Sequence, residues 1–478
     1  MPATIARTAV DDRMVKKLRN PLVLLAGAAL GSSLAPRLDL AIIGGITRLL
    51  KPVRAWAAAE AAEGDLARWR AELGLTAAAA RFGDRALLRR LHRTASRAAW
   101  RHMIWESTLF NNAALRDAST ASSWATELAG LEKQRKRSQR ALHNMRPLFL
   151  PFATGAFPAI GAPPVSPAEA ARLLIATGTA RPPLVLGTAL PNLQRSLAIV
   201  SSSTITYWLR WTSLEDGETG YARVIEPLLT VNGPSELPSI VICHGLGVEY
   251  ETAGPSIAFT NTLARRGLRI VLPESAGHGK RRRKGLYGGE AFLRGQPVSG
   301  VAHLLQSSAE TAELVAWCRA NGSATVALAG SSLGAMTAQL AAARAAESKV
   351  PEALPDHLLL VTPTGNLASL AFTSSLAIAA GLDRMVLEMG WTPESFREWS
   401  ALVEPPLAPP IDPAAISMVL GTVDTVTPYA DGLALAQRWR IPEKNLVIAG
   451  RGHFTSSIAM AFPGSALDKL AVALAAAL

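Results

Sequence analysis

The 478-residue sequence contains only two cysteines, Cys243 and Cys318. Two cysteines cannot form the disulfide framework of a small secreted domain, and nothing in the sequence has the ligand spacing of a zinc site. The chain must therefore rely on an ordinary hydrophobic core. It is long enough for one large α/β domain and a substantial addition.

Acidic residues are scarce in the first third of the chain. Residues 1–150 hold 25 Lys and Arg but 12 Asp and Glu, whereas the remainder holds 24 and 25. This excess of positive charge predicts one of two arrangements. Either an N-terminal module faces an anionic partner such as phospholipid head groups, or arginines decorate solvated helix faces. A nucleic-acid partner is not predicted.

A comfortable membrane-spanning run is also missing. Residues 21–35 are almost wholly apolar and follow a basic cluster, but Arg37 and Asp39 interrupt the run. Pro36 argues against signal cleavage directly after Ala35. Three interpretations stay open: a buried or interfacial helical pair bent at Pro36, a membrane-associated anchor, or an export signal. We expect a cytoplasmic protein, with peripheral membrane association and export as alternatives.

The hydrophobic pattern changes twice along the chain. Residues 51–146 carry apolar side chains at helical spacing, residues 147–164 are rich in Pro, Gly and Phe, and two strands are predicted before residue 232. Beyond residue 240, apolar strands alternate with helices, which is typical of a parallel sheet covered on both faces. These later strands are predicted at 239–244, 268–274, 324–330, 357–363, 416–422 and 444–450. The predicted fold class is therefore α/β, with a mostly parallel sheet and an N-terminal helical region.

The same pattern divides the chain into three predicted parts. Residues 1–150 form a basic helical region, 151–221 a linker and the first strands, and 222–478 the α/β domain. Within that domain, an insertion at about 364–415 separates two strands and is rich in Met, Phe and Leu. Side chains of this kind suit the wall of an apolar binding site.

The segment 325–336, TVALAGSSLGAM, predicts a sharp turn between a buried strand and a helix. A serine on such a turn projects its hydroxyl above the edge of the sheet, and the turn needs small residues two positions before and after it. Gly330 and Gly334 meet this need around Ser332, which is the candidate nucleophile. The N–H of Leu333, at the start of the helix, is then free to donate to an oxyanion. The alternative is a Gly/Ser-rich turn without chemistry.

A serine nucleophile needs a base and an acid that orients it. Among eight histidines, His453 follows the last predicted strand, in a predicted loop of small residues. Asp424 is the first acid after the preceding strand, although Asp383 and Asp431 are other acids nearby in the chain. A glycine-rich turn after the strand at 239–244 supplies the N–H of Leu246 as a second oxyanion donor.

Five motifs in order resemble the α/β-hydrolase superfamily over residues 222–478. They are HGLG at 244–247, ESAGHG at 274–279, GSSLG at 330–334, GTVDTVTP at 421–428 and GRGHF at 450–454, with Glu274 where the family's second motif has Asp. The resemblance implies an acyl intermediate on Ser332, with His453 as general base and acid, Asp424 as its orienting partner, and no metal or cofactor. It also implies that the insertion at 364–415 is the family's cap.

The substrate is predicted from residues near these motifs. We expect His244, Gly245 and His278 to contact it, and we expect Arg281 and Arg282, within the basic run 280–284, to bind an anionic group on the substrate or a lipid surface. A solvated basic loop is the alternative. The first hypothesis is a serine hydrolase that cleaves an apolar carboxylic ester, with lipid esters included. An acyltransferase with the same three residues and a non-catalytic binding module are the alternatives.

Overall fold

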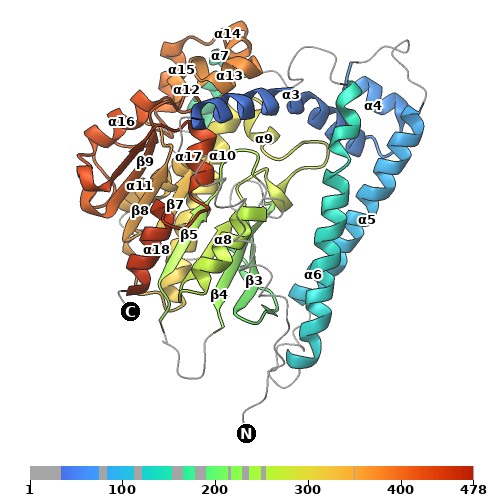
Figure 1. Ribbon diagram of the computed structural model, residues 1–478. Coiled ribbons are helices and arrows are strands. Elements are labelled where there is room, and N and C mark those ends of the chain that lie inside the picture. The colour runs from blue at the N-terminus through green and yellow to red at the C-terminus, as the bar shows by residue number, and fades with distance from the viewer. Residues whose placement is uncertain are drawn as a thin grey trace.

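A computed structural model describes residues 34–74, 83–111, 121–152, 165–177, 190–213, 217–228, 236–248, 254–348 and 350–476. Figure 1 shows a central sheet between two layers of helices, with a long pair of helices to one side. The apolar segment at 21–35 lies outside the described residues except for its last two positions, so the predicted bend at Pro36 is described on one side only.

The sheet has ten strands within the described residues, nine of them in the order β1-β3-β4-β6-β5-β7-β8-β9-β10, with β2 paired to β3. Strands β3 and β4 form an antiparallel hairpin, and β4 is antiparallel to β6. The neighbours from β6 to β10 are all parallel. The bounds are β1 (Gln194–Arg195), β2 (Ile199–Val200), β3 (Thr204–Thr212), β4 (Thr219–Pro227), β5 (Ser239–Cys243), β6 (Arg269–Pro273), β7 (Val326–Ser331), β8 (His357–Val361), β9 (Ile416–Gly421) and β10 (Leu446–Ala449).

Helices cover both faces of this sheet because its inner strands are apolar on both sides. One face packs against α10 (Val298–Ala320), α11 (Leu333–Ser348) and α16 (Tyr429–Arg438). The other packs against α8 (Gly254–Ala264), α17 (His453–Ala459) and α18 (Ala466–Ala476). The predicted fold class is therefore confirmed.

The predicted insertion contains four short helices between β8 and β9: α12 (Leu367–Phe372), α13 (Ser375–Ala380), α14 (Leu382–Glu388) and α15 (Pro393–Ser400). Helix α7 (Pro167–Thr177) and α9 (Glu290–Leu293) are also described, with short 3₁₀ turns η4 (Gly279–Arg281), η5 (Pro351–Ala353), η6 (Pro413–Ala415) and η7 (Glu443–Asn445). Figure 1 shows α12–α15 above the edge of the sheet where the parallel strands end.

The N-terminal region is helical, as predicted. It contains α3 (Ala35–Ala61), α4 (Leu66–Glu72), α5 (Asp84–Asn111), α6 (Ala121–His143) and the 3₁₀ turn η3 (Arg146–Phe152). Helices α5 and α6 lie antiparallel beside β3, where the ring centroids of Trp105 and Trp208 are 5.7 Å apart. Helix α3 instead runs across the top of the sheet toward α13 and α17 (Figure 1). The two ends of this region thus contact different parts of the α/β domain.

One local prediction was wrong: His453 was predicted in a loop, but it is the first residue of α17. Helix α3 is continuous through Pro52, and Pro36 lies in its first turn. A proline in the first turn costs no helical hydrogen bond, which explains why Pro36 starts the helix.

No single helix among the described residues is long and apolar enough to cross a membrane. The segments Leu367–Ala380 and Leu382–Glu388 meet that criterion only as a pair, which is bent by 116°.

Candidate active site

Ser332 lies on the turn between β7 and α11 with a backbone φ of +58°. This left-handed conformation is unfavourable for any residue except glycine, so the surrounding turn must enforce it. A Cβ added to Gly330 would lie 2.0 Å from the carbonyl oxygen of Gly334, and one added to Gly334 would lie 2.2 Å from that of Cys243. Only glycine fits at either position, and the predicted elbow is therefore confirmed.

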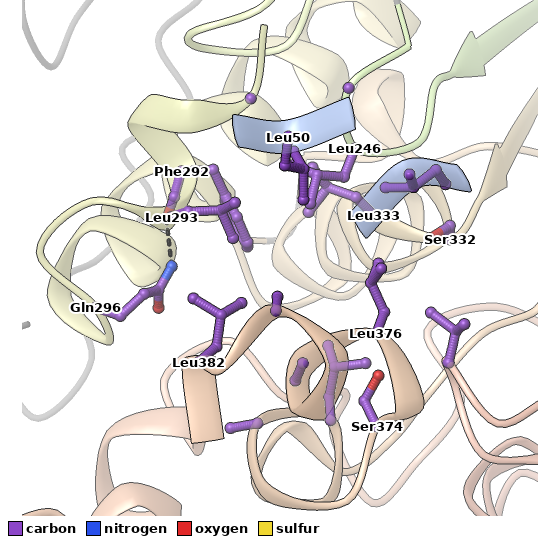
Figure 2. A pocket seen from close by; sticks show the side chains of 18 of the residues that line it. Leu50, Leu246, Phe292, Leu293, Gln296, Ser332, Leu333, Ser374, Leu376 and Leu382 are labelled. Atoms are coloured by element: carbon purple, nitrogen blue, oxygen red, sulfur yellow. Dashed lines mark hydrogen bonds between the residues drawn. The ribbon is translucent and has the colours of Figure 1, made fainter. Parts of the chain in front are cut away.

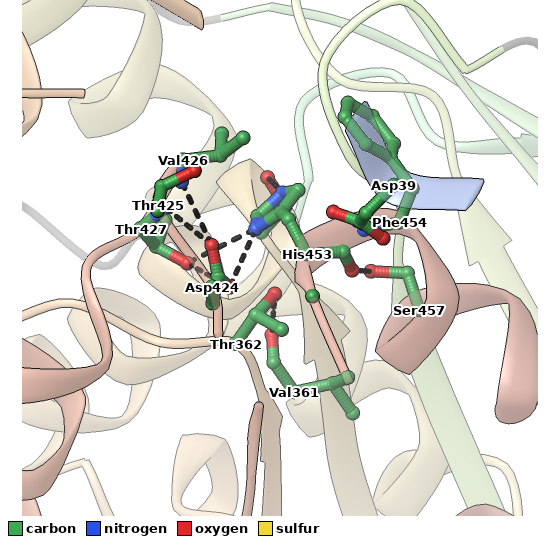
Figure 3. Close-up of polar contacts among 12 residues, drawn as sticks. Asp39, Val361, Thr362, Asp424, Thr425, Val426, Thr427, His453, Phe454 and Ser457 are labelled. Carbon is green, nitrogen blue, oxygen red and sulfur yellow. Dashed lines mark hydrogen bonds and ion pairs between the residues drawn. The ribbon is translucent and has the colours of Figure 1, made fainter. Parts of the chain in front are cut away.

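Ser332, His453 and Asp424 are joined by hydrogen bonds although they follow three different strands. The Nε2 atom of His453 lies 2.8 Å from Ser332 Oγ, and its Nδ1 atom lies 2.9 Å from Asp424 Oδ2. If Nδ1 carries the proton and donates it to the carboxylate, Nε2 is free to accept the serine proton. The three residues that the sequence singled out thus form one continuous chain of donors and acceptors. Figure 3 shows the contact between His453 and Asp424.

The Asp424 carboxylate is held by its own loop. Its Oδ1 atom accepts from the backbone N–H groups of Val426 and Thr427 at 2.8 and 3.0 Å, and its Oδ2 atom accepts from the Thr427 hydroxyl at 2.9 Å. Both His453 and Asp424 are buried. These bonds fix the carboxylate where it meets the imidazole, which explains why Asp424 rather than Asp383 or Asp431 takes this place.

The N–H groups of Leu246 and Leu333 have no protein acceptor among the described hydrogen bonds. Leu333 is the first residue of α11, where a helix leaves its N–H groups unpaired. The loop that carries Leu246 packs against the elbow, because a Cβ on Gly245 would lie 3.5 Å from Ser332 Cβ. Leu246 and Leu333 therefore lie near the candidate nucleophile, and both line the same cavity as Ser332.

His244 and His278 support this loop, and neither lines the cavity of about 490 Å³ that opens above Ser332. The Nε2 atom of His278 accepts from the N–H of Gly247 at 3.1 Å, and the Nε2 atom of His244 accepts from the N–H of Ser275 at 3.1 Å. Burial, and then the neighbouring His244 ring, lower the pKa of His278 from 6.5 to about 3. The ring is thus neutral at pH 7 and serves as an acceptor. The predicted substrate contacts of these two histidines are corrected to supports of the oxyanion loop.

The predicted anion-binding role of Arg281 and Arg282 is also corrected. Arg281 is buried and forms two hydrogen bonds to Glu310, at 2.5 and 3.1 Å. Arg282 bonds to Glu60 of α3 at 2.6 and 3.0 Å. The other cations of this loop are likewise paired with acids of the chain: Lys280 with Glu274, Arg283 with Glu218 and Lys284 with Glu63. The loop therefore binds α3 and the residues just after it, α10, and residues next to β4 and β6. None of its five cations lines the cavity above Ser332.

A largely apolar cavity of about 490 Å³ opens above Ser332. Leu246 and Leu333 line it beside the nucleophile, and Leu376 and Leu382 line it from the predicted insertion (Figure 2). The opposite wall is formed by α3, which contributes Ile46, Leu49, Leu50 and Val53. The sequence did not predict these four residues as part of the site. Their spacing at helical intervals was the available signal, but it indicates an apolar helix face without saying what the face contacts.

No group of three or more His, Cys, Asp or Glu side chains in the described part of the chain could hold a metal ion.

The sheet is antiparallel at its start and then parallel. Ser332 lies on the turn after β7, and it is joined by hydrogen bonds to His453, after β10, and through it to Asp424, after β9. The fold is that of an α/β-hydrolase.

Comparisons with known proteins find only low similarity. No protein-family model matches the chain, and no curated protein matches its sequence. It is similar to acetyl xylan esterase 1 from Thermoanaerobacterium sp. JW/SL YS485, with 15% identity, 59% of this chain and 86% of that chain covered, and a TM-score of 0.42. It is also similar to a thermostable esterase from Pseudomonas putida ECU1011, with 16% identity, 68% of this chain and 90% of that chain covered, and a TM-score of 0.36. For brefeldin A esterase the identity is 18%, the coverage is 66% of this chain and 87% of that chain, and the TM-score is 0.38. Likeness at this level carries no argument, so the fold and the function are argued from the described residues themselves.

Proposed function

We propose that the chain is a serine hydrolase that cleaves a carboxylic ester of an apolar substrate. The observation that carries the proposal is the pair of hydrogen bonds from His453, 2.8 Å to Ser332 and 2.9 Å to Asp424, at the floor of an apolar cavity. A buried serine and histidine in contact can also occur in a structural network. The unfavourable φ of Ser332 argues against that reading, because strain of this kind concentrates at functional sites.

In the proposed reaction, Ser332 Oγ attacks the ester carbonyl carbon while His453 Nε2 takes its proton. The carbonyl oxygen gains the negative charge and accepts from the N–H groups of Leu246 and Leu333. Collapse of this intermediate expels the alcohol, which takes the proton from His453 and leaves an acyl group on Ser332. Water then attacks the acyl carbon, His453 removes its proton and returns it to Ser332 Oγ, and the carboxylic acid leaves.

The lining of the cavity supports an apolar substrate. Its volume of about 490 Å³ suits a small organic ligand, and side chains from α3, α12–α14 and the elbow make most of its wall apolar. An acyl chain or another apolar group of medium size would fill it. The pairing of the basic loop within the protein removes the anionic substrate group from this proposal.

An acyltransferase with the same three residues is the second candidate. Exclusion of water by α3 and the insertion would favour it, whereas the basic loop no longer supports a carrier phosphate. Partition of the acyl group between water and an added alcohol separates the two reactions. Hydrolysis predicts the carboxylic acid as the main product, and transfer predicts the new ester.

The test of the proposal is hydrolysis of p-nitrophenyl esters of several chain lengths, together with labelling by a fluorophosphonate probe. We expect Ser332→Ala to abolish labelling and to lower kcat by about 10⁴-fold or more, since the covalent step is lost. Ser331→Ala is the matched control: its hydroxyl lies next in sequence but bonds to Ser457 at 2.7 Å. Labelling of the Ser332→Ala variant, or no labelling of the wild type, would refute the assignment.

A further inference from the structure

We infer that Asp39, on the N-terminal helix α3, is a positioning residue for His453. This inference rests on the proposed function, because it assigns Asp39 a role in the reaction that His453 performs. The motif resemblance covers residues 222–478 and does not include Asp39. The inference therefore extends the active site into the N-terminal region.

Asp39 is buried at the point where α3 meets the start of α17. Its Oδ1 atom accepts from the backbone N–H of Thr455 at 2.7 Å, and its Oδ2 atom accepts from that of Phe454 at 3.3 Å. Figure 3 shows Asp39 beside Phe454, on the side of His453 away from Asp424. Phe454 and Thr455 are the second and third residues of α17, so both N–H groups belong to the unpaired first turn.

A helix usually takes this cap from the residue directly before it, but that residue is Gly452, which has no side chain. Asp39 supplies the missing carboxylate from 416 positions earlier in the chain. Its negative charge also suits the positive end of the helix dipole. A Cβ on Gly452 would lie 2.3 Å from Asp39 Cγ and Oδ2, so the glycine is what lets the carboxylate approach.

The cap acts on His453 because this residue is the first of α17. The position and direction of its side chain follow from where the helix begins. Its two ring nitrogens must reach Ser332 and Asp424 together, and a shift of the first turn disturbs both contacts. A displacement of about 1 Å at a reacting group can cost about 100-fold in rate.

The first experiment replaces Asp39 and compares kcat and KM with those of a matched control. We expect Asp39→Ala to lower kcat by about 10- to 100-fold with little change in KM, since the variant disturbs the base rather than the apolar cavity. Asp39→Asn keeps a side-chain acceptor and restores most of the rate, because Asn caps a helix about as well as Asp. Asp65→Ala is the control: the Asp65 carboxylate accepts from the backbone N–H groups of Ala67 and Arg68 at the start of α4, and no residue of α4 lines the cavity above Ser332. It should leave kcat unchanged.

The second experiment tests whether Gly452 and Asp39 act through one contact. Gly452→Ala places a methyl group where the carboxylate lies and should lower kcat about as much as Asp39→Ala. The double variant should then be no slower than either single variant, whereas independent effects would multiply. Multiplied effects would overturn the inference.

Hydrogen exchange of the Phe454 and Thr455 amides tests the contact without relying on activity. Faster exchange of these amides in Asp39→Ala, but not in Asp65→Ala, is the expected result, and equal exchange would refute the cap. A faster exchange with unchanged kcat would refute the positioning role while leaving Ser332 as the nucleophile. A wild type that neither hydrolyses nor labels would instead overturn the proposed function, and the exchange result would still decide the contact.

Discussion

The buried ring of His278 predicts that the protein loses stability in mild acid. Burial holds the pKa of this histidine at about 3 in the folded state, against an ordinary value of 6.5. Between these two values the unfolded chain binds a proton at this position and the folded chain does not. The free energy of unfolding therefore falls as the pH is lowered below 6.5, by about 1.4 kcal/mol for each pH unit from this group. At pH 5 the loss amounts to about 2 kcal/mol.

Urea unfolding between pH 5 and pH 8 measures this loss. His278→Gln is the informative variant, because a glutamine oxygen can accept from Gly247 where the Nε2 atom does and does not titrate. We expect the variant to be less stable than the wild type at pH 8 by about 1 kcal/mol, a typical cost for a buried substitution. Between pH 6.5 and pH 5, the free energy of unfolding of the variant should fall less steeply than that of the wild type. The difference between the two slopes should be about 1.4 kcal/mol per pH unit.

The result that would refute this reasoning is an equal slope for the two proteins below pH 6.5. Above that pH, the ring is neutral in both folded and unfolded states, so no difference in slope is expected there. His278→Gln also tests the support of the oxyanion loop. The N–H of Gly247, the residue after Leu246, donates to the acceptor at position 278.

Two further predictions concern the elbow and the cavity. Gly330→Ala should lower the free energy of unfolding by about 3 kcal/mol, because the new Cβ meets the Gly334 backbone at 2.0 Å. Gly450→Ala, whose Cβ meets nothing within 4 Å, should change it by less than about 0.5 kcal/mol, and similar losses for both would contradict the steric argument. Leu50→Trp should lower kcat/KM for an octanoyl ester about tenfold relative to an acetyl ester, because it fills the α3 side of the cavity. Leu40→Trp, on the exposed side of α3, should not change kcat/KM for one ester relative to the other. An equal effect of the two substitutions would show that Leu50 does not face the substrate.

Three residues of the site could be predicted because each follows an apolar strand: Ser332, Asp424 and His453. Parallel strands end at one edge of the sheet, so residues that come directly after them are brought together even when they lie 121 positions apart, as Ser332 and His453 do. The steric demand at Gly330 and Gly334 is also local, and the pentapeptide shows it directly. The sequence alone was therefore enough to predict the sheet and these three residues.

The error over the basic loop had a different cause. A run of five cations shows its charge in the sequence but not its partners. Two of those partners are Glu60, in the last turn of α3, and Glu63, just after the helix. They lie 222 and 221 positions before Arg282 and Lys284. Whether a charge is solvated, paired or available to a ligand depends on such long-range contacts, and no pattern of spacing reports them.

The role of Asp39 also depends on a contact between residues far apart in the chain, and it differs from the role that the sequence suggests. In the sequence it is a charge that interrupts an apolar run. In the fold it caps the helix that begins with His453, and the helix itself was missed because Gly452 offers no cap of its own. A fragment limited to residues 222–478 would retain Ser332, Asp424, His453 and every matching motif. It would lack both this cap and the wall formed by Ile46, Leu49, Leu50 and Val53, so the boundary of the motifs is not the boundary of the site.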